Sequence, residues 1–150
     1  MTGALRPRVR VGVVVERSGA ILLVCHRKGE RRYWMLPGGG LQWGETLFAC
    51  GEREVREETG LAVAAERLCF VAESVAPDAS RHVVSMIISA RLVGGRLRTP
   101  TEEIIDTVEW HSVESLAGLE LYPPIGPQLR DGLLAGFPAQ AVHLGALWAE

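Results

Sequence analysis

The sequence has few cysteines, few aromatic residues and no extended apolar segment. Its three cysteines, Cys25, Cys50 and Cys69, are widely spaced and form no CxxC pair, so we expect buried packing residues and no disulfide framework. No apolar run approaches the roughly 20 residues that span a bilayer, and no apolar signal-peptide segment follows the basic residues near the start. These absences predict no membrane partner and a cytoplasmic location.

The sequence also lacks an excess of either charge. It has 16 Lys and Arg residues and 18 Asp and Glu residues, which gives a net charge of −2. Without a long basic block, a nucleic-acid partner is not expected. A free nucleotide or a sugar diphosphate needs only a local positive site, so that class of small ligand stays open. The length and the hydrophobic fraction of 47% favour one globular domain over residues 1–150.

Apolar runs separated by turn signals outline the secondary structure. Strands are predicted at 9–16, 21–25, 33–36, 61–74, 82–92 and 107–111, and helices at 46–59, 113–119 and 125–134. Strands on both sides of one strong helix predict an α/β fold with a mixed sheet and flanking helices. The apolar residues 141–148 fit a strand or a helical turn. They could contact a second subunit, which would make a homodimer, or pack back onto the same domain.

Three carboxylates follow one face of the helix predicted at 46–59. Glu54, Glu57 and Glu58 are related by i, i+3 and i+4, so they lie close together and repel one another. Hard divalent cations such as magnesium would relieve that repulsion and could bridge phosphate oxygens. A carboxylate left free of metal could then take a proton from water.

A glycine loop precedes this helix. Gly38, Gly39 and Gly40 carry no side chain, so their backbone can approach a metal or a phosphate closely. Thr46 suits the helix N-terminus, and Gly60 suits a left-handed cap at its end. The sequence therefore predicts a glycine loop that leads directly into a carboxylate-bearing helix.

Arg53 could hold the glutamates in place. It is i, i+4 to Glu57, and Glu45 before the helix could accept a bond from the same guanidinium. Alternatively, residues 52–58 could be a solvated helix face with ordinary ion pairs. That alternative does not explain why the glycine loop, Glu45 and Gly60 occur at fixed sequence distances from the glutamates.

The stretch Gly39 to Leu61 matches the Nudix signature G-x5-E-x7-R-E-U-x-E-E-x-G-U, where U is a bulky aliphatic residue, at every specified position. The chain therefore resembles the Nudix hydrolase family, more loosely over residues 9–120. The resemblance implies an α/β/α sandwich that hydrolyses the pyrophosphate bond of a nucleoside diphosphate linked to another moiety. Water would attack phosphorus with Mg²⁺ or Mn²⁺ as cofactor. The alternatives are a catalytically weak nucleotide-binding or sensor module and a diphosphate isomerase on the same fold.

The resemblance also implies roles for individual residues. The catalytic and metal-binding set that it implies is Arg53, Glu54, Glu57 and Glu58, with Arg53 orienting the glutamates. It adds the carbonyl of Gly38 and a glutamate from a late loop, with Glu103 preferred and Glu102 as second choice.

Contacts to the substrate are predicted less sharply. Arg27, Gly39, Gly40 and Glu45 are the candidate substrate-binding residues, and Tyr33 or Trp34 could stack on a base. The loops at 76–81 and 98–106 are expected to select the moieties on either side of the diphosphate. The sequence does not identify the substrate itself.

Overall fold

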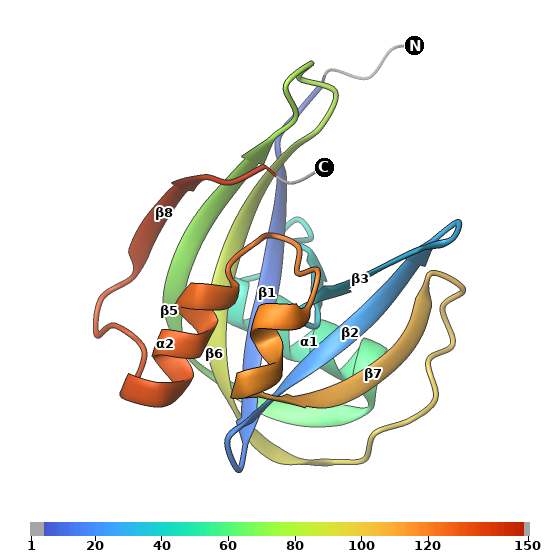
Figure 1. Cartoon of the computed structure of the whole chain (residues 1–150), viewed down its shortest axis with the longest axis vertical. Helices are drawn as coiled ribbons and strands as arrows, with labels where there is room; N and C mark the ends of the chain where they lie inside the picture. The colour runs from blue at the N-terminus through green and yellow to red at the C-terminus, as the bar shows by residue number, and fades with distance from the viewer. Residues whose placement is uncertain (1–4, 149–150) are drawn as a thin grey trace.

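The computed structural model describes residues 5–148 (Figure 1). The prediction of one domain over 1–150 includes residues 1–4 and 149–150, which lie outside this described part. The elements in chain order are β1 (Arg8–Arg17), β2 (Ala20–Lys28), β3 (Arg31–Met35), β4 (Gly38–Gly40), α1 (Leu47–Thr59), β5 (Leu61–Val75), β6 (His82–Gly95), β7 (Ile105–Ser112), the 3-10 helix η1 (Val113–Gly118), α2 (Gly126–Ala135) and β8 (Val142–Ala146).

The strands of the described chain form one eight-stranded mixed sheet. Its main order is β3-β2-β1-β6-β5-β8, while β4 pairs with β1 and β7 pairs with β2. The pairs β1–β6 and β5–β8 are parallel, and the other neighbours are antiparallel. The mixed sheet that the sequence predicted is therefore confirmed.

Helices cover both faces of the sheet (Figure 1). On one face, Cys50 and Val55 of α1 pack against alternate valines of β1. On the other face, η1 and α2 contribute Leu116 and Leu129 to a second core that includes Val14 of β1. Strand β1 is apolar on both sides because it is covered twice, which explains the continuous apolar run in the sequence. The layers form the expected α/β/α sandwich.

Helix α1 begins and ends as the sequence predicted. The Thr46 side chain accepts a hydrogen bond from the Ala49 N–H at 3.1 Å, and Gly60 adopts a left-handed φ of 81°. Gly51 brings the helix close to the sheet, since a Cβ there would lie 2.5 Å from Ile88 Cδ1. The helix that carries the glutamates is therefore fixed against the centre of the sheet.

Three segments differ from their predictions or resolve an open alternative. The residues between the strands predicted at 21–25 and 33–36 are mostly strand, because β2 and β3 form a hairpin that turns at Gly29 and Glu30. The glycines at 38–40 form β4 and pair with β1. The apolar tail forms β8, which pairs with β5, and its Leu144 packs against the core, so it packs back onto the same domain. None of the helices among residues 5–148 is long and apolar enough to cross a membrane.

Candidate active site

The three predicted glutamates of α1 all line one cavity of about 360 Å³. Their exposure differs, because Glu58 is buried against the sheet with 5% of its surface accessible, whereas the side chain of Glu57 is 54% exposed. Glu54 lies between these extremes at 16%. One helix face therefore presents carboxylates at three depths to the same space.

The glycines of β4 give these carboxylates room. A Cβ on Gly39 would lie 2.4 Å from Cδ of Glu54, so no larger residue fits there without displacing that side chain. The N–H of Gly38 donates a hydrogen bond of 2.6 Å to Glu58. The N–H and C=O of one residue in a strand point to the same side, so the Gly38 carbonyl faces the side where Glu58 lies.

Burial changes the protonation of Glu58. Removal from water raises its pKa to about 7, although the hydrogen bond from Gly38 and the nearby charge of Arg10 lower it in part. Arg10 is partly buried, and its removal from water lowers the pKa of its guanidinium against the opposing effect of Glu58 and Glu54. In the metal-free protein, Glu58 therefore changes charge near neutral pH.

Arg53 connects the glycine loop to the glutamates. Its Nε and Nη2 donate to the two carboxylate oxygens of Glu45 at 2.8 and 2.9 Å. Its Nη1 donates to Glu54 at 2.8 Å and to Glu57 at 3.1 Å. The guanidinium lowers the pKa of Glu45 to about 2, so this carboxylate stays ionised. The contacts suit the orienting role that the resemblance implied for Arg53.

Cationic side chains line the same cavity as the glutamates. Arg8 and Arg10 extend from β1, and Arg81 is the last residue of the loop at 76–81. Arg8 lies beside the glycine strand, since a Cβ on Gly40 would be 3.2 Å from its Nη2. The cavity therefore combines carboxylates with guanidinium groups, which suits an anionic ligand bound through cations and arginines.

The glutamates do not form a ready-made metal cage. Residues 5–148 contain no group of three or more His, Cys, Asp or Glu side chains placed to hold a metal ion. The reason is local, because Arg53 engages Glu54 and Glu57 while Glu58 is bonded to Gly38. The donors still fit a hard divalent cation, since carboxylate and carbonyl oxygens are the ligands that Mg²⁺ prefers.

Three predicted substrate or metal residues lie elsewhere than expected. Arg27 is exposed on β2 and does not line the cavity, whereas its neighbour His26 does, because successive side chains of a strand face opposite ways. Glu45 is not at the cavity either, because Arg53 holds its carboxylate. Glu102, the second choice, lines the cavity in place of Glu103. Gly39 and Gly40 do line it.

The sequence reasoning missed Arg8 and Arg10. Their period-two spacing along β1 places both on one side of the strand, and that signal was present in the sequence. Which side faces the glutamates depends on the pairing of β1 with β4, a contact between residues nearly 30 positions apart. The neutral His26 was missed as well, and burial lowers its pKa to about 4.

Comparison with known proteins agrees with this geometry. Residues 6–132 match the family described as NUDIX domain. The chain is 34% identical over 95 residues to the ADP-ribose pyrophosphatase of Methanocaldococcus jannaschii, which covers 63% of this chain and 56% of that protein. It is 34% identical over 99 residues to a MutT-like protein of Streptomyces ambofaciens, covering 66% and 59%. The match thus spans less than two thirds of the length of each of these two relatives.

Solved structures share the fold. A NUDIX hydrolase from Nitrosomonas europaea superposes with a TM-score of 0.76 at 24% identity, over 89% of this chain and 94% of that one. A MutT NUDIX hydrolase from Burkholderia pseudomallei gives a TM-score of 0.66 at 29% identity, over 73% and 86%. The family match covers most of the chain, including the glycine strand and the glutamate helix, so the protein belongs to the NUDIX domain family.

Proposed function

We propose that this protein hydrolyses the pyrophosphate bond of a nucleoside diphosphate linked to a second moiety, with Mg²⁺ or Mn²⁺ as cofactor. The observation that carries the proposal is the convergence of Glu54, Glu57 and Glu58 with arginines on one cavity. Membership of the NUDIX domain family supports the same activity. Because one relative is named ADP-ribose pyrophosphatase, ADP-ribose belongs in the first substrate panel.

The cation would be held by Glu54, Glu57, Glu58 and the Gly38 carbonyl. When bound, it would neutralise charge on the diphosphate and acidify a water molecule. Arg53 keeps Glu54 and Glu57 oriented through its anchor on Glu45.

Protons and phosphates would be handled by the chain itself. A glutamate whose oxygen is free of metal accepts the proton of the attacking water, and the anhydride P–O bond breaks as the new bond to phosphorus forms. Arg8, Arg10 and Arg81 would bind the phosphate oxygens of the substrate and the departing phosphate. Glu102, which lines the cavity, would be the loop carboxylate that completes the site.

The test is hydrolysis of ADP-ribose, dinucleoside polyphosphates and nucleoside triphosphates with Mg²⁺, followed by product identification. Glu57→Gln and Glu58→Gln should lower the rate by orders of magnitude while the circular dichroism spectrum is unchanged. Glu52→Gln is the matched control, because Glu52 lies on the same helix but does not line the cavity. Equal rates for Glu57→Gln, Glu58→Gln and the wild type would remove the proposed role of the glutamates.

We also infer a cytoplasmic location and a homodimer, the latter because β8, although it packs on its own domain, is an edge strand of the sheet with Val142 exposed. All three cysteines are free and buried, which suits a reducing compartment. Light scattering tests the dimer, and a monomer at all concentrations would dismiss it.

A further inference from the structure

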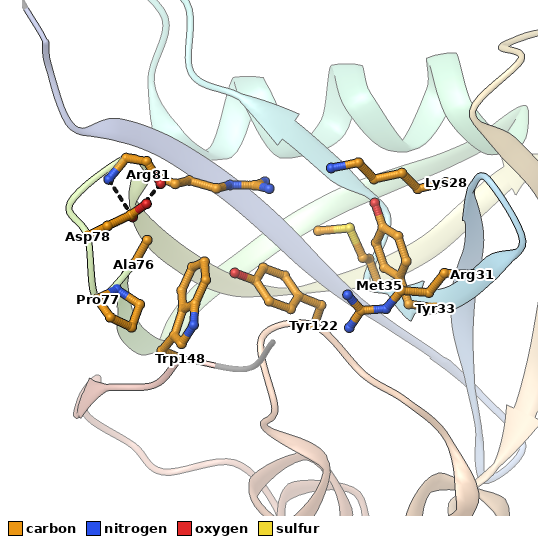
Figure 2. A pocket seen from close by; sticks show the side chains of 11 residues that line it. Lys28, Arg31, Tyr33, Met35, Ala76, Pro77, Asp78, Arg81, Tyr122 and Trp148 are labelled. Atoms are coloured by element: carbon orange, nitrogen blue, oxygen red, sulfur yellow. Dashed lines mark hydrogen bonds between the residues drawn. The ribbon is translucent and has the colours of Figure 1, made fainter.

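A second pocket, of about 530 Å³, adjoins the glutamate cavity (Figure 2). The two spaces share four lining residues, Tyr33, Met35, Arg81 and Tyr122. A group attached to a diphosphate in the glutamate cavity can therefore extend into this pocket without crossing bulk protein. We call it the aromatic pocket, after its Tyr33, Tyr122 and Trp148 side chains.

The rings of the aromatic pocket come from three separate parts of the chain. Tyr122 lies between the other two, with ring centroids 6.4 Å from Tyr33 and 6.4 Å from Trp148, and both pairs are edge-to-face. The guanidinium of Arg81 lies 5.8 Å from the centroid of the Tyr122 ring (Figure 2). A planar ligand would need about 7 Å between two flat groups, because each contact takes about 3.5 Å. A small outward movement of the Arg81 side chain would open that space.

Trp148 is held at this pocket by the end of β8. The N–H of Leu147 donates to the Glu73 carbonyl at 2.6 Å, and the Ser74 hydroxyl donates to the Leu147 carbonyl at 2.9 Å. Ser74 also lines the glutamate cavity, so these bonds hold Leu147, the residue before Trp148, close to that cavity. Within residues 5–148, the buried Nε1 of Trp148 has no hydrogen-bond partner.

Trp148 also lies outside the family match, which ends at residue 132. Strand β8 and Trp148 therefore lie beyond the part of the chain that the family match covers. A residue that closes a pocket beside the reaction site can select among substrates.

We propose that the Tyr122 ring, with Arg81 on the opposite side, forms a stacking site for a planar heteroaromatic ring, the base of the nucleoside diphosphate. Trp148, which meets Tyr122 edge-to-face, borders that site and determines specificity for the base. This inference rests on the proposed function. Flat aromatic side chains bind any base through its π face, and an arginine can stack on the opposite face. Lys28 lines the same pocket and adds positive charge, which suits a nucleotide that carries phosphate.

The test measures binding apart from hydrolysis. Calorimetry in EDTA compares AMP, GMP, UMP and CMP with ribose 5-phosphate, which lacks only the base. At least one nucleotide should bind the wild type tenfold or more tightly than ribose 5-phosphate. Trp148→Ala should remove most of that difference, Trp148→Phe should keep most of it, and ribose 5-phosphate should bind all three proteins equally.

Trp43→Ala is the matched control, because Trp43 is fully exposed and lies outside the aromatic pocket. It should bind nucleotides like the wild type. The inference is overturned if no nucleotide binds the wild type better than ribose 5-phosphate. This comparison uses the wild-type protein alone, so it does not depend on whether a variant folds. It is also overturned if Trp148→Ala folds and keeps the preference for the base.

Hydrolysis assays distinguish a failure of this inference from a failure of the proposed function. Cleavage of ADP-ribose with no preference over its adenine-free analogue would keep the proposed function and remove the stacking site. Trp148-dependent binding of a nucleotide, with no hydrolysis of any diphosphate, would keep the stacking site and remove the proposed function.

Discussion

The guanidinium of Arg53 holds the carboxylate of Glu45 through two parallel bonds of 2.8 and 2.9 Å, and it contacts Glu54 and Glu57 at the same time. Glu45 lies before α1, so this pair ties the loop to the helix. The side chains of Arg53 and Glu45 are only 25% and 14% exposed, which limits screening by solvent. The positions of the cavity glutamates thus depend on a residue that does not line the cavity.

Glu45→Gln should lower metal affinity or kcat/KM by about 10- to 100-fold, as is typical when a partner of a ligating side chain is lost. Gln keeps the shape of Glu45 but loses the charge that fixes the Arg53 fork. Arg53→Lys should have a similar effect, because an ammonium cannot make two parallel bonds while also contacting Glu54. Magnesium titrations of activity provide the measurement. Wild-type magnesium dependence in both variants would show that the pair does not position the glutamates.

The stability of the metal-free protein should depend on pH through Glu58. Its folded pKa of about 7 lies above the ordinary value of 4.5. The contribution to stability is therefore fully present below pH 4.5 and is lost as pH rises through about 7. We expect the free energy of unfolding in EDTA to fall by at most about 3 kcal/mol from this group between pH 4.5 and 8.5.

Urea unfolding of the wild type and of Glu58→Gln measures this contribution. The variant cannot ionise at this position, so the difference between the two proteins should follow the titration of Glu58. Parallel pH profiles for the two proteins would contradict the effect of burial on this carboxyl group.

Gly39→Ala should impair activity more than folding. The added methyl group would meet the carboxylate end of Glu54, a side chain that can move aside without disturbing the core. The Tm should stay within a few degrees, while kcat/KM should fall by about tenfold or more, because small misplacements at a catalytic centre are costly. Gly94→Ala is the control, since a Cβ there meets nothing within 4 Å. If Gly39→Ala were as active as Gly94→Ala, the close contact between Gly39 and Glu54 would not matter for activity.

Gly51→Ala should have the opposite profile and destabilise the fold. Alanine gains about 1 kcal/mol of helix propensity. Its methyl group, however, would lie 2.5 Å from Ile88 Cδ1 in a fully buried contact, and overpacking of a core costs about 1–3 kcal/mol. We therefore expect a net loss of stability of up to about 2 kcal/mol in urea unfolding. A variant more stable than the wild type would show that the helix can move away from the sheet.

Local signals in the sequence were enough to predict α1 and its caps. Thr46, Gly60 and the i, i+3, i+4 spacing of the glutamates all act within one helix, so their geometry follows from helical periodicity. The glycines before that helix were predicted as a loop, whereas the structure pairs them with β1 as strand β4. Apolar strands on both sides of one strong helix predicted a mixed sheet with flanking helices, and the resemblance to the Nudix family implied the α/β/α layers.

Contacts between distant parts of the chain could not be predicted. Arg8 and Arg10 reach the glutamates only because β1 pairs with β4. The choice between Glu102 and Glu103 depends on how an irregular loop turns before β7, which no periodicity specifies. Trp148 meets Tyr122 because β8 pairs with β5, and the sequence left open whether that segment was a strand.

The most direct test of the account is a crystal of the protein soaked in Mn²⁺, with the metal located by its anomalous scattering. The account predicts a peak bounded by carboxylate oxygens of α1 and by the Gly38 carbonyl, with Arg53 still bonded to Glu45 and orienting Glu54 and Glu57 toward the ion. No peak at this site would contradict it.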